Sequence, residues 1–484
     1  MQTRRQWFQK LAIGCAAASL AGCSQPKAAL DPGLRAWNRA AFGPRPGDLE
    51  GFRLEAFVEE QLHPAEIDDA VCERRLAEAE LSTLDLSLEQ LWKGYYLPSE
   101  EAESQDDWEQ AGRPYSETVQ ATWLRAVYSR RQLHEVLVDF WHNHFNVYGL
   151  HDDVYSLLAA YDRDAIRAHT LGNFSEMLLG VARHPVMLLY LDNGSNEVSG
   201  PNENYARELL ELHTLGAMHY AGASSPRTGF FVDNDVYEVA RCFTGWGVDD
   251  GDDDDTLGGS GRFRYRLERH DRFNKLVLGE WLRSDQDGMV EGEAVLRRLA
   301  EHPSTARHLA FKLCRRFVSD DPPAALVEKA ADVFWKARHA NDQLRQVVGF
   351  ILRSPEFLAA ESFMLKRPFE FAASLARALA VDFEPDEEFL ESFEAIGQPL
   401  FGRVTPDGYP DRAEAWLQTS GWLARWQLVE GWLAGVPTRG PLELEKWSRR
   451  LLGRPCTHPE VLAGCRNPRE LVGLLAMGPD FQIR

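Results

Sequence analysis

Apolar residues recur at three- and four-residue steps along most of the chain, a pattern typical of amphipathic helices. Over residues 161–182 the pattern is interrupted at Gly172, so a first helix is expected to end there and Asn173 to cap a second one. The same spacing predicts helices over 304–313 and 344–352. The fold class predicted from these positions is mainly α, in the form of a multi-helix globular array.

Alternation of apolar and polar residues, which indicates a strand, is scarce in this sequence. It occurs weakly over 262–278, where one small β-hairpin is expected. Residues 249–261 form an acidic, glycine-rich stretch that predicts a loop. This loop either binds Ca²⁺ through its carboxylates or is only solvated, since it lacks the ligand spacing of an EF-hand. Residues 35–484 are expected to form a single helical domain, with a division into two lobes near this loop as the alternative.

The first residues predict an export signal rather than folded structure. Arg4 and Arg5 precede an apolar run over 11–20, and residues 20–23 (Leu-Ala-Gly-Cys) resemble a lipobox. The apolar run is about half of the ~20 residues that a membrane-spanning helix needs. We therefore expect residues 1–22 to be a signal peptide of the twin-arginine type. The general secretory route is the alternative, because the lysine that follows the arginines stands one place later than in the usual pattern.

After cleavage, Cys23 would be the first residue, acylated by a fatty acid such as palmitate, with residues 23–34 as a tether. Ser24 follows it, and a residue other than Asp at this position lets a lipoprotein of a two-membrane organism reach the outer membrane. The expected location is therefore the cell envelope, on the periplasmic face of the outer membrane. Removing residues 1–22 takes away three of the 53 basic and none of the 74 acidic residues, so the net charge changes from −21 to −24. A surface of this charge repels phosphates, which argues against a nucleic-acid partner.

The first motif that could carry chemistry is Phe-Trp-His-Asn-His-Phe at residues 140–145. Its apolar lead-in over 133–140 places it at the end of a helix. Side chains two residues apart on an α-helix point about 200° away from each other, so His142 and His144 can bind one ion only if the helix ends at Asn143. Two interpretations stay open: structural histidines with satisfied hydrogen bonds, or a site that binds metal or moves protons.

A second motif covers residues 201–216 and predicts one short helix. Asn202 or Asn204 is the expected N-cap, because a side-chain oxygen there can accept from the first free N–H groups. Gly216 is the expected terminator.

Three oxygen-bearing side chains of this helix, Asn204, Glu208 and Glu211, stand at i, i+4 and i+7 and so share one face. Two carboxylates one turn apart either hold a divalent cation or raise the pKa of one of them, which would then serve as a base. The alternative is that Arg207 pairs with Glu203 and Glu211 along an exposed stripe.

The leading hypothesis combines these motifs in one polar pocket, together with a third pair that by itself could equally be a turn. The side chains expected to bind a divalent metal are His142, His144, Glu208, Glu211, His270 and Asp271. Of these, His142, His144 and Glu208 are the expected catalytic residues. The reaction would be metal-assisted hydrolysis or oxidation.

Enzyme activity itself is left open by the residues. The sequence has no H-E-x-x-H, no G-x-S-x-G, no phosphate-binding glycine loop and no haem-attachment motif. The main alternative is a noncatalytic envelope scaffold or accessory lipoprotein. A third hypothesis is binding of carbohydrate or peptidoglycan through exposed Trp246, Trp281 or Trp416.

Taken together, the motifs resemble an uncharacterised bacterial family, the domain of unknown function numbered 1800. The landmarks that carry the resemblance are Asn38-Arg39-Ala40-Ala41-Phe42-Gly43-Pro44, Phe140-Trp141-His142-Asn143-His144-Phe145, Leu191-Asp192-Asn193, Asn202-Glu203-Asn204, Glu208-Leu209-Leu210-Glu211-Leu212, Thr244-Gly245-Trp246, His270-Asp271, Arg316-Phe317-Val318, Pro355-Glu356-Phe357, Gly397-Gln398-Pro399-Leu400-Phe401 and Pro406-Asp407-Gly408-Tyr409-Pro410. They extend over most of the chain.

The resemblance implies an exported, mostly helical protein and carries no established activity. Members of the family are often encoded beside another exported family that resembles sulfatases and phosphatases, so a protein partner of that kind is implied. This sequence departs from the family pattern in its acidic insertion at 249–261, which puts a family-wide role of that loop in doubt.

Overall fold

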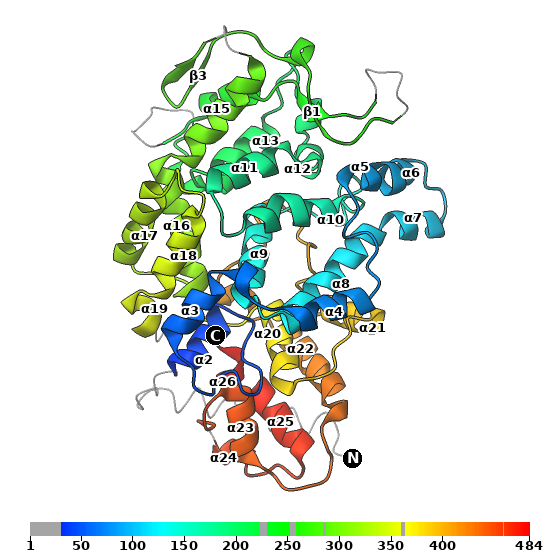
Figure 1. Cartoon of the computed structure of the whole chain (residues 1–484), viewed down its shortest axis with the longest axis vertical. Coiled ribbons are helices and arrows are strands. Elements are labelled where there is room, and N and C mark those ends of the chain that lie inside the picture. The colour runs from blue at the N-terminus through cyan, green and yellow to red at the C-terminus, as the bar shows by residue number, and fades with distance from the viewer. Residues whose placement is uncertain (1–30, 223–229, 252–257, 284–286, 360–363, 458) are drawn as a thin grey trace. The chain divides into compact units, whose positions relative to one another are not determined.

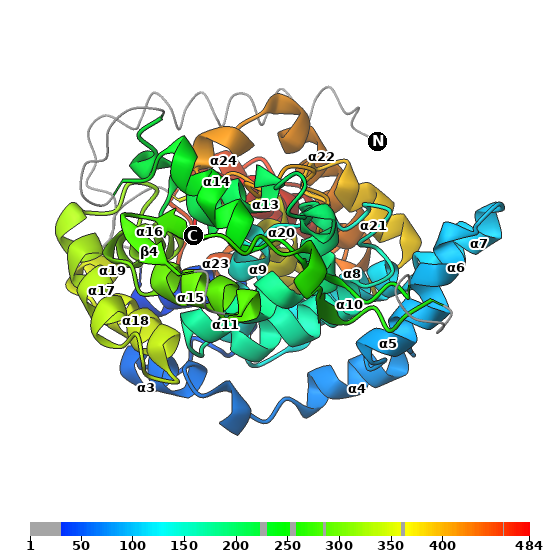
Figure 2. The same ribbon diagram turned by 90° about the horizontal axis from the view of Figure 1, so that it is seen from above.

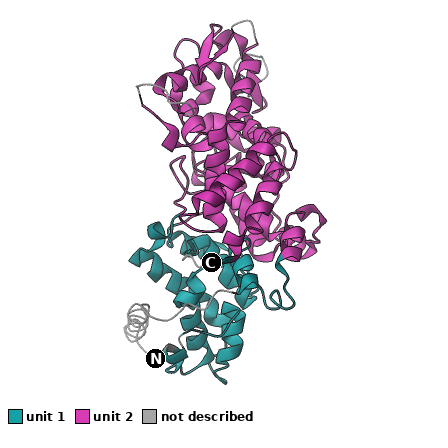
Figure 3. Cartoon of the chain, turned by 90° about the vertical axis from the view of Figure 1, so that its left-hand side faces the viewer, with its two compact units in different colours: residues 1–54, 359–397, 412–484 teal, residues 55–358, 398–411 magenta. Residues whose placement is uncertain are grey.

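The chain forms two compact units in the computed structural model, which describes residues 31–222, 230–251, 258–283, 287–359, 364–457 and 459–484. Unit 1 contains residues 1–54, 359–397 and 412–484, and unit 2 contains residues 55–358 and 398–411 (Figure 3). The residues on both sides of the loop 249–261, near which the alternative division into two lobes was expected, belong to unit 2. Residues 252–257 of the loop, and with them most of the predicted Ca²⁺-binding carboxylates, lie outside the described residues.

Unit 2 is mainly helical and carries the two motifs singled out in the sequence (Figure 1). Its α-helices are α3 (Leu54–Gln61), α4 (Ala70–Glu78), α5 (Leu88–Leu91), α6 (Leu97–Glu100), α7 (Gln105–Ala111), α8 (Arg113–Tyr128), α9 (Gln132–His144), α10 (Leu158–Ala160), α11 (Phe174–Arg183), α12 (Pro185–Tyr190), α13 (Glu203–Glu208), α14 (Asp233–Cys242), α15 (Gly288–Ala300), α16 (Pro303–Phe317), α17 (Ala324–Lys336), α18 (Gln343–Leu352) and α19 (Pro355–Ala359). Three further segments are π-helical: η2 (Trp92–Tyr96), η3 (Tyr161–Ile166) and η6 (Leu209–His213).

The local signals in the sequence explain where several of these helices begin. Asn173 caps α11, since its side chain accepts from the N–H groups of Ser175 and Glu176. The helices predicted over 304–313 and 344–352 are α16 and α18, which lie side by side with α17 in both Figure 1 and Figure 2. The segment that precedes Gly172 was predicted to be an ordinary helix and is instead π-helical η3 followed by a 3-10 turn.

Strands contribute little, as predicted, but they pair differently from the expected hairpin. Strand β2 (Phe263–Tyr265) pairs antiparallel with β1 (Trp246–Val248), and β3 (Lys275–Val277) pairs antiparallel with β4 (Glu280–Leu282). The two strands that fall within 262–278 therefore belong to different two-stranded sheets. The prediction of a mainly α fold with small β-hairpins is confirmed.

Unit 1 is built around α20 (Pro368–Leu379), which is buried along its whole length. A helix that is buried on all sides needs neighbours all round, and α22 and α23 pack against it. The other helices of this unit are α2 (Pro32–Arg39), α21 (Glu387–Glu394), α22 (Thr419–Trp432), α23 (Leu444–Leu452), α24 (Pro459–Leu462), α25 (Pro468–Met477) and α26 (Pro479–Gln482).

The predicted signal peptide, Cys23 and most of the tether lie within residues 1–30, outside the described residues. In the part of the chain that the structure describes, no helix is both long and apolar enough to cross a membrane.

Candidate functional site

The histidine motif lies at the carboxyl end of α9, which runs on through His144 and ends at Phe145. The helix therefore does not stop at Asn143, as binding of one ion by both histidines would require. Because the last turn stays helical, the two imidazoles point to opposite sides of the helix, and each meets a different set of partners. At this end of the helix, the fully buried rings of Trp141, Phe145 and Phe174 pack with centroids 6.1–6.2 Å apart.

His142 belongs to a cluster of buried ion pairs. Its Nε2–H donates to Oδ1 of Asp162 at 2.8 Å, and Asp162 stands on the π-helical turn η3. The guanidinium of Arg167 donates to the other oxygen of Asp162 at 2.7 Å and to both oxygens of Glu135 at 3.1 and 2.9 Å. Arg125 completes the set, 3.7 Å from Asp162. We call these five residues the ion-pair cluster.

Charge is balanced within the ion-pair cluster. Burial acts to raise the pKa of Asp162, but Arg167, His142 and Arg125 outweigh it and hold that pKa well below its ordinary value. Burial likewise opposes the effect of Arg167 on Glu135, and the pKa of Glu135 is again strongly lowered. The pKa of Arg167 is raised in return, although burial acts to lower it. Both carboxylates are thus fully ionised, and they tie η3 to α9.

His144 faces a second group of side chains that holds nitrogen groups and no carboxylate. Its Nε2–H donates to the carbonyl oxygen of His213 at 3.1 Å, so its Nδ1 carries the lone pair that accepts from Lys312 Nζ at 3.0 Å. His308, one turn before Lys312 on α16, donates its Nε2–H to the carbonyl of Leu212 at 3.2 Å. We call His144, His213, His308 and Lys312 the nitrogen cluster.

Two imidazoles of the nitrogen cluster thus donate hydrogen bonds to carbonyls at the end of a helix. The last carbonyls of a helix have no partner within it, and η6 ends at His213. The carbonyls of Leu212 and His213 accept from His308 and His144 instead of from a following turn. Gly216 then ends the motif at φ +93°, and a Cβ there would lie 2.8 Å from Nδ1 of His308, so only glycine fits.

The three imidazoles of the nitrogen cluster are neutral. Burial first, and then the positive charge of Lys312, lower the pKa of His213 and of His308 to about 3 and that of His144 well below its ordinary value. Burial also lowers the pKa of Lys312, and no carboxylate of the described residues lies within 4 Å of its Nζ. His213 is 1 % exposed, and neither of its ring nitrogens has a hydrogen-bond partner among the described residues.

Segment 398–411 of unit 2 covers the end of α9 between the two histidines. The side chain of Asn143 pairs with the backbone of Tyr409, donating to its carbonyl at 2.9 Å and accepting from its N–H at 2.6 Å. Asn146 donates to the carbonyls of Arg403 and Thr405, both at 2.9 Å. The ring of Phe401 lies edge-on to His142 at 4.8 Å. Two asparagines therefore fasten this segment over the histidine motif.

Gly408 fits this arrangement for a steric reason. Its φ is +74°, and a Cβ would stand 2.2 Å from the carbonyl oxygen of Asn143.

The second motif forms α13 and then η6, with Asn202 rather than Asn204 as its N-cap. Arg207 pairs with Glu203 at 3.1 Å and with Glu211 at 3.4 Å, which is the surface stripe that the sequence offered as the alternative to a site. Glu208 differs from its neighbours because it is half-buried and has no hydrogen-bond or ion-pair partner among the described residues.

The environment of Glu208 keeps a proton on it more readily than usual. Its pKa is raised, first by burial and then by Glu211 and Asp407. The pKa of nearby Tyr190 is raised to about 12, again by burial first and then by Glu208. The Tyr190 hydroxyl donates to the carbonyl of Val404 at 2.7 Å. Because Asp407 raises the pKa of Glu208 and Glu208 raises that of Tyr190, Glu208 lies within electrostatic reach of segment 398–411.

His270 and Asp271 belong to another part of unit 2. His270 donates from Nδ1 to the carbonyl of Thr244 at 2.8 Å and accepts at Nε2 from Lys275, which pairs with Glu291 at 2.5 Å. Asp271 pairs with Arg241 at 2.8 and 3.1 Å. Burial acts to raise the pKa of Asp271, but the Arg241 guanidinium and the N–H of Phe273 outweigh burial and hold this pKa below its ordinary value.

The structure therefore does not bring the six predicted metal ligands together. His142, His144, Glu211, His270 and Asp271 are each held by a different partner. Among the described residues, no group of three or more His, Cys, Asp or Glu side chains is arranged to hold a metal ion. Of the aromatic residues proposed for carbohydrate binding, Trp246 is 1 % exposed and part of the core.

Sequence reasoning missed most of the partners of the two histidines. Glu135 stands on the predicted helix that leads into the histidine motif, and Arg125 lies outside the predicted helices; neither has a local signal. Asp162 and Arg167 fall in a segment that was predicted to be an ordinary helix. One signal was available for the nitrogen cluster. His308 and Lys312 are four residues apart on a helix that was predicted, so they had to share a face.

These features define a mainly helical protein with two clusters of buried polar residues at the end of one helix. The chain belongs to the family described as Protein of unknown function (DUF1800), whose model matches residues 35–483. The resemblance inferred from the sequence motifs is thereby confirmed. A search of the curated proteins and a search of the solved structures gave no match.

Proposed function

We propose that the protein is an accessory lipoprotein of the cell envelope, anchored by lipid at Cys23, that positions an exported partner and does not itself catalyse a reaction. The anchor is supported by the order of the first residues: paired arginines, a short apolar run, and a small-residue sequence that ends in Cys23. Ser24 favours the periplasmic face of the outer membrane. The partner class, an exported protein that resembles sulfatases and phosphatases, is taken from what the resemblance of the sequence motifs implies.

One observation carries the noncatalytic role. Of the six side chains that the sequence offered for chemistry, five are engaged by groups of the fold itself, and Glu208 alone has no such partner in the part of the chain that the structure describes. His144 supports a helix end, and His142 joins an ion-pair cluster that is already balanced in charge. Groups used in this way stabilise the fold and are poorly available to a substrate.

The anchor is tested by Cys23→Ser, expressed beside the native protein in cells fed a clickable palmitate analogue. We expect the native chain to carry the label and to sediment with membranes. The variant should be unlabelled and appear in the soluble fraction, because a thioether-linked lipid can form only on the Cys23 thiol. Equal labelling of both proteins, or equal sedimentation without label, would refute the anchor.

The noncatalytic role is tested by elemental analysis of the purified protein beside His142→Ala and Glu208→Ala. The expected result is no stoichiometric metal in any of the three. A metal that is present in the native protein and lost in both variants would instead support the metal-dependent hydrolase or oxidase.

A second candidate function, acid–base catalysis without a metal, is favoured by one specific observation. The pKa of Glu208 is raised while that of Lys312 is lowered, and opposite shifts of this kind are typical of an acid and a base tuned to work near neutral pH. Asp407 adds to the raised pKa of Glu208 and opposes the lowering of the pKa of Lys312 by burial, so it stands within electrostatic reach of each group.

The two functions are separated by hydrolysis assays with p-nitrophenyl phosphate, sulfate and acetate. The accessory role predicts rates equal to those of buffer for the native protein. Turnover that is lost in both Glu208→Gln and Lys312→Met, with unchanged melting temperatures, would favour the enzyme.

A further inference from the structure

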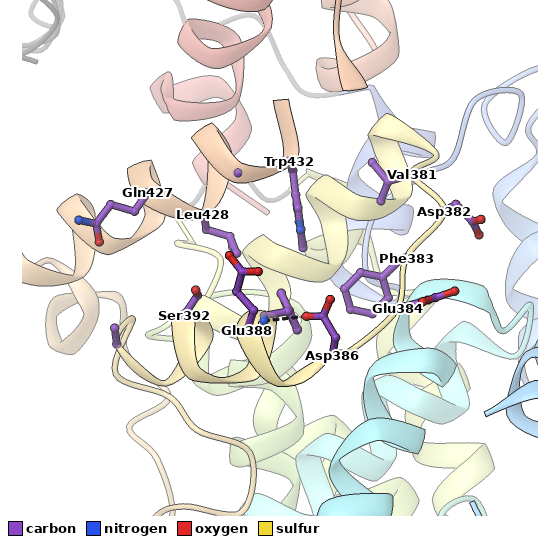
Figure 4. Close-up of a pocket in the computed structure, with 13 residues that line it drawn as sticks. Val381, Asp382, Phe383, Glu384, Asp386, Glu388, Ser392, Gln427, Leu428 and Trp432 are labelled. Carbon is purple, nitrogen blue, oxygen red and sulfur yellow. Dashed lines mark hydrogen bonds between the residues drawn. The ribbon is translucent and has the colours of Figure 1, made fainter. Parts of the chain in front are cut away.

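Unit 1 contains a hollow between the loop 381–386, helix α21 and helix α22 (Figure 4). Its volume is about 480 Å³, which is large enough for an amino-acid side chain with part of its backbone. All the residues that line it belong to unit 1. None of them was singled out in the sequence, so this hollow is independent of the histidine motif.

One wall of the hollow is aromatic. The ring of Phe389 is stacked against Trp432, with centroids 5.6 Å apart and planes 16° apart, and Phe383 meets both rings edge-on at 5.0 and 5.9 Å. The two phenylalanines are buried, whereas Trp432 is partly exposed and stands over the space in Figure 4. The stack thus holds the partly exposed Trp432 ring in the lining of the hollow.

The rest of the lining is acidic. Asp382, Glu384, Asp386 and Glu388 contribute carboxylates, and no lysine or arginine contributes to the lining. Asp386 is used by the fold, since it caps α21 through the N–H of Phe389 at 2.8 Å. Glu388, in contrast, is exposed, faces the space beside Trp432 in Figure 4 and has no ion-pair partner among the described residues.

The surrounding sequence strengthens this charge. From residue 378 to residue 402 the chain holds seven acidic residues and no basic one. An exposed acidic helix attracts cations over a wide area, and the hollow adds an apolar surface to that attraction.

We propose that this hollow is a docking site for a lysine or arginine side chain of the exported partner, with the cationic group between Glu388 and the Trp432 ring. The inference rests on the proposed accessory function and names the surface through which it acts. A basic side chain fits both parts of the site, since its aliphatic stem packs on apolar surface while its charged end stays near water and carboxylates. The face of an indole attracts a cation as well, by about 0.5–1 kcal/mol at an exposed site.

The test uses the purified full chain and a fluorescein-labelled peptide of lysine and serine, with a peptide of glutamate and serine as its counterpart. Fluorescence anisotropy should show saturable binding of the lysine peptide alone. Glu388→Gln and Trp432→Leu should each weaken this binding up to about fivefold, because each removes one of the two contacts with the cation.

Glu391→Gln is the matched control, since it removes the same charge from an exposed position of α21 outside the lining and should change the affinity less than about twofold. Equal losses in Glu388→Gln and Glu391→Gln would overturn the proposal, because they would show general attraction to an acidic helix. Displacement of the peptide by spermidine at equal concentration would also overturn it, in favour of a free polyamine ligand.

Trp432→Leu is accepted only if its melting temperature stays close to that of the native protein, and Glu388→Gln carries the test if it does not. The assay needs neither the lipid nor the partner. Its failure would therefore leave the anchoring experiment intact, and failure of the anchor would leave this result intact.

Discussion

The ion-pair cluster and the nitrogen cluster surround two histidines that stand two residues apart on the same helix. Each cluster accommodates a buried imidazole, and the two do so in opposite ways. His142 is buried among groups of both charges, which neutralise one another. His144 is buried among nitrogen groups only, and its surroundings keep the imidazoles uncharged. The difference teaches that a repeated residue type in a short motif need not indicate a shared role, because an α-helix directs side chains two residues apart into different environments.

Removal of the central cation from the ion-pair cluster should have the largest effect. Arg167→Met leaves Glu135 and Asp162 buried with fewer positive partners, and breaking a buried pair in this way costs about 3–5 kcal/mol. Urea unfolding of the purified protein, followed by far-ultraviolet circular dichroism, should show the loss as a lower midpoint for unit 2.

Arg307→Met is the matched control for this prediction. Arg307 also pairs with a carboxylate through two nitrogens, at 2.8 and 3.3 Å to Glu328, but both side chains are about half exposed. Exposed pairs contribute less than about 1 kcal/mol, so the midpoint should barely move. If both variants lose the same stability, burial does not distinguish the ion-pair cluster.

The two clusters should also lose stability over different pH ranges. The pKa of His213 and of His308 falls from 6.5 in the unfolded chain to about 3 in the folded one, so the unfolded chain binds more protons in between. The contribution of these two histidines to stability is therefore complete above pH 6.5 and is lost as the pH is lowered toward 3. The lowered pKa values of Asp162 and Glu135 stabilise the fold above their ordinary values of 3.8 and 4.5, and that contribution is lost only below about pH 4.5.

His213→Phe isolates the nitrogen cluster in this pH dependence. Removing one imidazole that stays neutral should reduce the slope of stability against pH by about 1.4 kcal/mol per pH unit between pH 6 and pH 4. The phenyl ring should be accepted beside Phe145, whose ring centroid is 5.1 Å from that of His213. The difference between variant and native slopes is the quantity to compare, since other buried imidazoles such as His184 contribute to both. An unchanged slope would mean that His213 is charged in the folded protein.

The smallest effect is expected from Lys312→Met. The variant removes a donor to His144, but it also removes a half-buried ammonium whose pKa is lowered by burial. The two effects oppose each other, so thermal and urea unfolding should stay within about 1 kcal/mol of the native protein. A loss as large as that of Arg167→Met would show that Lys312 pairs with a charge in solution.

Local rules predicted much of the fold. The cap at Asn173, the helix that carries the histidines, the glycine that ends the second motif and the small share of strand all follow from residues close together in the sequence. The pairing of Arg207 with Glu203 and Glu211 was also within reach, because it depends only on helical spacing.

The partners of the histidines could not be predicted in the same way. Asp162 and His213 stand on π-helical turns, which hold one residue more per turn than the α-helix assumed from the pattern. That extra residue changes which side chains share a face, so the apolar spacing alone misplaces them. The contacts to Tyr409 and Lys312 join segments more than a hundred residues apart, and periodicity carries no information on such pairs.

The insertion of segment 398–411 into unit 2 has a consequence for how the chain is made. Everything else in that unit is synthesised by Leu358, yet the backbone groups that Asn143 and Asn146 bind arrive only with Arg403, Thr405 and Tyr409. During translation, the side-chain amides of Asn143 and Asn146 therefore lack these backbone partners until residues 359–397 of unit 1 have been synthesised. A fragment that ends at Leu358 would lack segment 398–411 and the hydrogen bonds that it makes with α9. Because both units consist of separate stretches of the sequence, neither unit can be obtained by a single cut of the gene.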